Sequence, residues 1–176
     1  VDANLITEDE FDKILISKCI VELEKKHPRL VMAAQLLVIL GFRCGLRRSE
    51  AIGLSLHDFH MDDPSFLFIR PNRFRGLKTP NALRALPIGA LLNNEEHELF
   101  KVWFDLRQEE TRGQAGPHYF FSVPEQGGPV LSEKSIFEKI REAFGEVTGD
   151  PTLRFHHLRH SFATWTLLKL MLAEEN

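Results

Sequence analysis

The sequence feature that most constrains the fold is a long apolar segment in the first third of the chain. Residues 29–44 are apolar at nearly every position, and Gln35 is the polar residue of its central part. A helix that is apolar around its whole circumference is stable only when other elements cover every face. We therefore predict a buried central helix over about 29–44, ended by Gly45. The segment is too short to span a bilayer, which argues against a membrane protein.

Apolar periodicity predicts further helices around this segment. Thr7 and Glu10 form a capping box, which opens a helix expected to run to the His27-Pro28 pair. Residues 66–70 and 83–88 have the composition of strands. The remaining helices are expected at about 49–54 with Ser49 as cap, 95–112 with Leu99, Val102, Trp103 and Leu106 inward, 132–148 with Ser132 as cap, and from His156 to the end. The prediction is a mainly α fold with a small antiparallel β-sheet (α+β), as a single domain over residues 1–176.

Charge is unevenly distributed along the chain. The formal net charge is −3, whereas a domain that wraps nucleic acid is usually basic. Residues 70–84 nevertheless contain five basic residues and no acidic one, so we expect a positive face there. The loop 73–79 is expected to be mobile without DNA, because its charges repel one another and it has few apolar side chains. The five basic residues are Arg70, Arg73, Arg75, Lys78 and Arg84.

The two cysteines and the chain ends carry further expectations. Cys19 and Cys44 lie in apolar helical context and are expected to be buried thiols of a reducing, cytoplasmic compartment. The first residue is Val, so we expect an excised or processed fragment. Residues 167–172 are apolar on more than one helical face, and we expect this end to self-associate or to pack against a neighbour.

Polar residues gather where the last predicted helix begins. His156, Arg159 and His160 are spaced so that they share one side of a helical turn. An imidazole beside a permanent cation at a helix N-terminus suits an oxyanion or a phosphate. When this stretch is taken alone, a solvated helix start whose polar side chains only cap the backbone is slightly the better explanation.

Two other segments have the same ambiguity. Arg47, in Gly45-Leu-Arg-Arg-Ser-Glu50, stands at a tight turn between helices, where an isolated arginine would face water. Lys78 stands in a basic loop between the two predicted strands, where a lone hairpin lysine would do the same.

Taken together and in this order, the three segments resemble the tyrosine recombinases, the phage integrase family. The match consists of Gly45–Glu50 with Asp58 downstream, Lys78 with Arg84-Ala-Leu-Pro87, and His156-His-Leu-Arg-His-Ser-Phe-Ala163. The opening of the family's domain resembles Leu5–Phe11, so the resemblance covers nearly the whole chain. Each motif is weak alone, whereas the ordered set is specific.

The resemblance implies site-specific recombination of double-stranded DNA through a 3′-phosphotyrosyl intermediate, by a tetramer on DNA and associated with the nucleoid. It implies that Arg47 and Arg159 hold the phosphate, that Lys78 protonates the leaving 5′-hydroxyl and that His156 assists proton transfer. Guanidiniums bind phosphate oxygens bidentately and can replace a metal's charge, so no cofactor and no metal are expected. The remaining site assignments are Glu50 and His160 as supporting residues, His160 by packing, and Arg48, Arg73, Arg75 and Arg84 as DNA contacts.

The sequence departs from the family in its nucleophile. The family's tyrosine follows the second arginine, whereas the one tyrosine here, Tyr119, precedes it and is interpreted as a core or strand aromatic. Trp165 lies too close to Arg159 to replace the family's later His or Trp, and we assign it to packing. We expect a partial catalytic domain that binds DNA without cleaving it.

Two other hypotheses remain open. One is a non-catalytic DNA-binding or assembly module derived from an integrase, which a parent gene continuing into a Tyr-bearing helix would exclude. The other is a zinc protein using His156 and His160, whose spacing suits helical ligands but which have no convincing third ligand. Metal analysis of the purified chain tests this zinc hypothesis.

Overall fold

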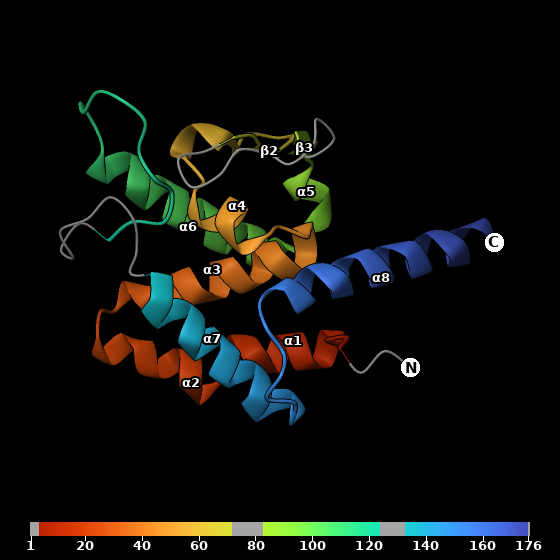
Figure 1. Cartoon of the computed structure of the whole chain (residues 1–176). Coiled ribbons are helices and arrows are strands. Elements are labelled where there is room, and N and C mark those ends of the chain that lie inside the picture. The colour runs from red at the N-terminus through yellow and green to blue at the C-terminus, as the bar shows by residue number, and fades with distance from the viewer. Residues whose placement is uncertain (1–3, 72–82, 124–132, 176) are drawn as a thin grey trace. The chain divides into compact units, whose positions relative to one another are not determined.

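The computed structural model describes residues 4–71, 83–123 and 133–175 (Figure 1). Most of these residues are helical, and the strands form one small antiparallel sheet, which confirms the predicted fold class. The chain forms two compact units, one from residues 1–48 with 134–176 and the other from residues 49–133. The assignment of residues 1–176 to one domain stays a prediction. Within the described residues, no helix is both long and apolar enough to cross a membrane.

Helix α3, Arg29–Cys44, is the buried centre of the first unit. Its side chains from Leu36 to Leu40 are fully buried, as predicted from their apolar character. Gly45 caps the helix with φ of 69°, a left-handed conformation that glycine adopts without strain. The predicted bounds and the predicted stop are both confirmed.

The segment before α3 differs from the single helix predicted. It comprises α1 (Glu8–Leu15), α2 (Lys18–Val21) and the 3₁₀-helix η1 (Glu22–Lys25). The capping box of Thr7 and Glu10 is confirmed. The break comes at Ser17, whose hydroxyl accepts from the Cys19 N–H at 3.2 Å and donates to Glu146 at 2.6 Å. Ser17 is thus the N-cap of α2, so a new helix begins there.

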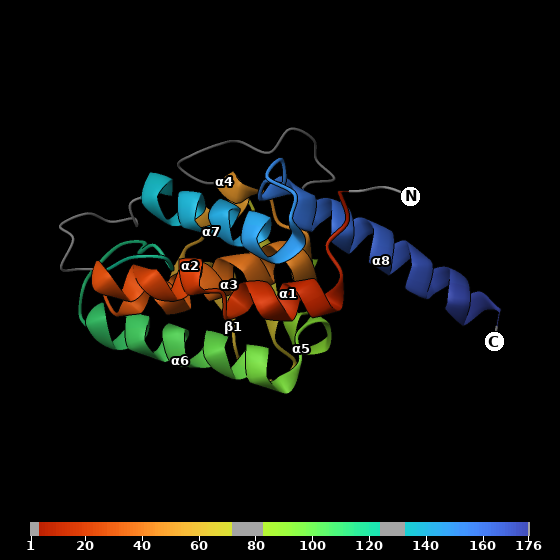
Figure 2. The same ribbon diagram turned by 90° about the horizontal axis from the view of Figure 1, so that it is seen from below.

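Helices α7 (Glu133–Thr148) and α8 (His156–Glu174) complete the first unit. The predicted inward side of α7 is confirmed, and the proposed Ser132 cap lies outside the described residues. Helix α8 starts where predicted and packs on α3 (Figures 1 and 2). The Leu158 side chain lies against Gly41, where an added Cβ would come within 2.7 Å of it, so the two helices approach closely. The buried residues of α7 include Ile136, Phe137, Ile140 and Phe144.

The far half of α8 is exposed. Figures 1 and 2 show it projecting beyond the other helices of its unit. Trp165 anchors the near half, because its indole N–H donates to the Ile6 carbonyl at 2.8 Å, in agreement with a packing role. The exposed apolar side chains of the far half are Leu167, Leu168, Leu170, Met171 and Leu172.

The second unit holds the sheet, with strands β1 (Phe59–His60), β2 (Phe66–Ile69) and β3 (Arg84–Leu86) in that order. Strand β2 pairs Leu67 with Phe59 on one side and with Leu86 on the other. The two-residue β1 was not predicted, and Pro87 caps helix α5 (Ile88–Leu91) where the strand was expected to continue.

Two short helical turns precede the sheet in sequence. They are α4 (Arg48–Ile52) and the 3₁₀-helix η2 (Leu56–Asp58). Helix α4 begins at Arg48, so Ser49 lies inside the helix and the prediction of a Ser49 cap is wrong.

Helix α6, Asn94–Glu110, buries Trp103 as predicted, but the rest of its buried face differs from the prediction. Val102 and Leu106 are exposed, and the buried stripe consists of Glu96, Phe100, Trp103 and Arg107. The polar ends of this stripe are satisfied by hydrogen bonds: Glu96 in a capping box with Asn93, and Arg107 to the Tyr119 carbonyl at 3.0 Å. A prediction from the spacing of apolar residues cannot include buried charged residues, which are stabilised by such hydrogen-bond partners.

Candidate active site

The turn after α3 and the first turns of α8 are joined by a direct hydrogen bond. Nη1 of Arg159 donates to the Gly45 carbonyl oxygen at 2.8 Å, across 114 positions of sequence. The Phe162 ring lies against the Gly45 Cα, so a side chain at position 45 would overlap it. Glycine is therefore required here for its backbone conformation and for space. Two of the three predicted motifs thus meet in the first unit.

Arg47 follows Gly45 by two residues and belongs to the same turn. The intervening Leu46 is fully buried, and its N–H donates to the Leu40 carbonyl at 3.3 Å, which fixes the backbone that leads into Arg47. Arg47 and Arg159 are both half-buried. The structure therefore brings the backbone that carries Arg47 and the side chain of Arg159 to one part of the unit. Two permanent cations in such a place favour an anion between or beside them.

Three histidines cluster on the first turns of α8. The His156 and His157 ring centroids are 4.1 Å apart, and that of His160 lies 5.5 Å from His156. His156 is exposed and available to a ligand. His160 is exposed too, and its ring centroid lies 5.6 Å from that of His157, so its supporting role stays a prediction. The buried imidazole is His157, to which sequence reasoning gave no role.

The surroundings of His157 favour its neutral form. Its Nδ1 accepts a hydrogen bond from the Arg154 N–H at 2.8 Å. Burial, together with the charges of His156 and His160, lowers the pKa of His157. Among the described residues, no three or more His, Cys, Asp or Glu side chains are arranged to hold a metal ion.

A basic cleft of about 430 Å³ lies beside His156 in the first unit. Four of its lining residues are cationic and one, Glu138, is acidic. Arg48 sits over the Phe137 ring, 4.2 Å from its centroid, so this predicted DNA contact is held in place by a cation–π interaction. The cleft is lined by Arg48, Lys134, Phe137, Glu138, Arg141, Arg154, Phe155 and His156.

Three of these cations were missed in the sequence. Lys134 and Arg141 lie seven positions apart on α7, on either side of Phe137 with which they line the cleft, and Arg154 precedes α8. No ion pair joins Lys134 or Arg141 to another residue in the part of the chain that the structure describes. The helical spacing of these exposed cations was the signal available in the sequence.

In the second unit, Glu50 and Arg84 form a bidentate pair. Both guanidinium–carboxylate distances are 3.1 Å, and the Glu50 side chain is 2% exposed. Glu50 thus holds the β3 arginine in a fixed position, which fits a supporting role. Lys78, Arg73 and Arg75 lie outside the described residues, as does the loop expected to be mobile.

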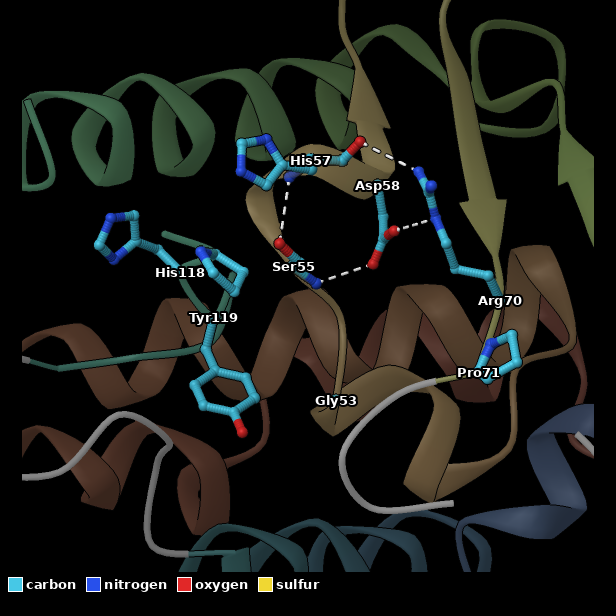
Figure 3. Close-up of a pocket in the computed structure, with 9 residues that line it drawn as sticks. Gly53, Ser55, His57, Asp58, Arg70, Pro71, His118 and Tyr119 are labelled. Atoms are coloured by element: carbon cyan, nitrogen blue, oxygen red, sulfur yellow. Dashed lines mark hydrogen bonds and ion pairs between the residues drawn. The ribbon is translucent and has the colours of Figure 1, made fainter. Parts of the chain in front are cut away.

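Tyr119 lies in a pocket of about 340 Å³ in the second unit, formed with His57, His118 and Arg70 among others (Figure 3). Asp58, the family's downstream aspartate, accepts from the Ser55 N–H at 2.8 Å and from Arg70 Nε at 2.7 Å, so it holds this loop together. The Tyr119 backbone pairs with Ser55, but its side chain is half-buried at the pocket. Tyr119 therefore makes one isolated β-bridge and belongs to none of the three strands, and the fully buried aromatic side chains beside it are Phe120 and Phe121.

Comparison with known proteins decides the family. The model of the phage integrase family matches residues 5–171. The chain belongs to the phage integrase family. This integrase-family chain is similar to the tyrosine recombinase XerD of Halalkalibacterium halodurans, with 33% identity over 126 residues, which cover 72% of the chain and 38% of that relative.

Solved recombinases share the fold of this integrase-family chain. XerH bound to difH substrate, in a post-cleavage complex, aligns with a TM-score of 0.64 at 22% identity, over 96% of the chain and 43% of XerH. XerA aligns with a TM-score of 0.59 at 19% identity, over 93% of the chain and 50% of XerA. The Tn1549 transposon integrase, in complex with a circular intermediate DNA, aligns with a TM-score of 0.58 at 19% identity, over 94% of the chain and 53% of that integrase. The chain thus spans about half the length of these proteins, or less.

Proposed function

We propose that the first unit binds a phosphodiester of double-stranded DNA during site-specific recombination. The observation that supports this most strongly is the hydrogen bond from Arg159 to the Gly45 carbonyl, which joins the two arginine motifs. Attack on a phosphodiester places extra negative charge on the non-bridging oxygens of a five-coordinate phosphorus. Paired guanidiniums stabilise that charge without a metal, because each offers two parallel N–H donors to the oxygens.

The whole protein is proposed to carry out a transesterification with these residues. A tyrosine hydroxyl attacks phosphorus, the tyrosine–phosphorus bond forms, and the bond to the 5′-oxygen breaks. Arg47 and Arg159 hold the non-bridging oxygens, His156 assists proton transfer from the nucleophile, and Lys78 protonates the leaving 5′-oxygen. A well-placed acid or base contributes a factor of about 10²–10⁴ in rate.

A polypeptide of these 176 residues is proposed to bind DNA but not to cleave it. Tyr119 is its one tyrosine, and it lies in the second unit with its main chain paired to Ser55. Water is no substitute for tyrosine in recombination, because hydrolysis would discard the bond energy that the covalent intermediate conserves for rejoining. Adducts formed by this polypeptide on a suicide DNA substrate, and lost in Tyr119→Phe, would overturn this part of the proposal.

The basic cleft is proposed to carry the flanking DNA backbone. It adds Lys134, Arg141 and Arg154 to the predicted contact Arg48, and Arg73, Arg75 and Arg84 of the second unit remain proposed contacts. Each phosphate neutralised contributes about −0.9 to the slope of log affinity against log salt. Loss of one cleft cation should therefore lower the slope by about one and weaken different duplex sequences equally.

Assembly on DNA is proposed to use the exposed half of α8. Five apolar side chains between Leu167 and Leu172 are more than 40% exposed, a pattern that marks interaction surfaces. This surface also favours the second candidate function, an assembly module without catalysis. The two functions differ in the arginines, because a module for assembly alone has no need of Arg47 or Arg159.

The test measures DNA binding by arginine variants. Fluorescence anisotropy with a mixed-sequence duplex at low salt gives the affinity. Arg47→Ala and Arg159→Ala are each expected to weaken binding about tenfold or more, since a hydrogen bond to a charged group is worth about 1.5–3 kcal/mol. Lys25→Ala is the matched control, because Lys25 is an exposed cation of the same unit that does not line the cleft. Equal affinities in all three variants would refute the proposed site.

A further inference from the structure

The first turn of α8 is capped in an unusual way. Phe155 stands at the N-cap position, and its side chain makes no capping hydrogen bond. Arg154 and His157 instead bond reciprocally: the His157 N–H donates to the Arg154 carbonyl at 2.9 Å, and the Arg154 N–H donates to His157 Nδ1 at 2.8 Å. One half of this arrangement resembles a capping box, in which a Glu or Gln side chain accepts from the N–H three residues earlier; here the imidazole takes that place, and the return bond goes to a backbone carbonyl.

This bond specifies the tautomer of His157. A nitrogen that accepts a hydrogen bond carries no proton, so the ring is neutral and its proton is on Nε2. The environment acts in the same direction, because the ring is only 8% exposed and lies near His156 and His160. The Asp150 carboxylate is an opposing influence, and burial outweighs it.

The capped turn lies between the two site residues of α8. His156 comes directly before His157, and Arg159, which bonds Gly45, comes two residues after it. The far side of the turn is fixed as well, since the His157 carbonyl accepts from the Ser161 hydroxyl at 2.8 Å. A change in this first turn would therefore move the His156 ring and the Arg159 guanidinium together.

We propose that His157 is a positioning residue whose unprotonated Nδ1 holds the first turn of α8, and thereby sets the direction of His156 and Arg159 toward the phosphate. This inference rests on the proposed function of those two residues. The pattern His-x-Leu-Arg-His specifies no residue at position 157, so it suggested no role for His157. The imidazole acts through the backbone and does not touch the substrate.

The test compares His157→Asn with His157→Leu. The Asn Oδ1 can replace Nδ1 as acceptor for the Arg154 N–H, whereas Leu retains bulk and removes the acceptor. We expect Leu to weaken binding of a mixed-sequence duplex about fivefold, the factor that corresponds to one hydrogen bond. Asn should restore most of the affinity. A folded Leu variant with wild-type affinity, or an Asn variant as weak as Leu, would overturn the proposal.

Two readouts without DNA separate this inference from the proposed function. Solvent exchange of the Arg159 guanidinium protons should be faster in the Leu variant than in the Asn variant, because the bond to Gly45 is disturbed. In the wild type, ¹⁵N spectra should show His157 neutral with the proton on Nε2 at about pH 7. A proton on Nδ1 overturns the proposal even if the Leu variant does not fold. Failure of the wild type to bind DNA refutes the proposed function, and these readouts still decide the role of His157.

Discussion

Replacement of Gly45 by Ala should be strongly destabilising, for two separable reasons. The backbone there has φ of 69°, and an L-residue forced into such a conformation costs about 1–3 kcal/mol. The added Cβ also overlaps the Phe162 ring, and overpacking of a tight contact costs about 1–3 kcal/mol. We expect a total of about 3–4 kcal/mol, a fall in Tm of roughly 6–16 °C for a chain of this size.

The two contributions can be separated with matched variants. Gly149→Ala is the control for backbone strain alone, because Gly149 has φ of 80° and no atom within 4 Å of an added Cβ. It should cost about 1–2 kcal/mol. In a Phe162→Ala background the cost of Gly45→Ala should fall to a similar value, since only the backbone contribution remains. Urea denaturation followed by circular dichroism measures all four variants. A Gly45→Ala cost no greater than that of Gly149→Ala would refute the close packing of α8 on this turn.

Three further outcomes are expected. Arg84→Ala should lower the free energy of unfolding by about 2–4 kcal/mol in thermal denaturation, because it removes the bidentate partner of the buried Glu50 carboxylate; a change below about 0.5 kcal/mol contradicts this. Because the pKa of His157 is lowered in the folded state, the unfolded chain binds more protons, so the free energy of unfolding should fall as pH drops below about 6.5. The fall should be smaller in His157→Asn, and an equal pH dependence of unfolding in the wild type and this variant would contradict the prediction. Leu168→Glu with Leu172→Glu should abolish self-association in sedimentation velocity without unfolding the chain, since both side chains are exposed; unchanged sedimentation would exclude this surface.

Local sequence information was sufficient where one interaction type dominates. Helix α3 was predicted with its bounds because apolar residues fill every face, and the Gly45 stop follows from glycine's conformational freedom. The split at Ser17 was not predictable, since the bond that stabilises it goes to Glu146, 129 positions away. The buried face of α6 was missed because Arg107 is charged, and its burial depends on a carbonyl of Tyr119 that no pattern places beside it.

In the candidate site, too, some residues could be predicted from the sequence and others only from the packing. Arg47, His156 and Arg159 could be named because their residue types and order resemble a family pattern. The bond between Arg159 and the Gly45 carbonyl needed the packing of α8 on α3. His157 could not be named, because its role depends on burial and on a backbone N–H three residues earlier.

The central claim, that Arg47 and Arg159 bind one phosphate, is tested most directly by a double-mutant cycle. Duplex affinity is measured at one low salt concentration for the wild type, Arg47→Ala, Arg159→Ala and the double variant. If both guanidiniums hold the same phosphate, the double variant should lose clearly less binding free energy than the sum of the two single losses, with a coupling of about 1 kcal/mol or more. Additive losses, within about 0.5 kcal/mol, would mean that the two arginines bind separate phosphates and would contradict the account.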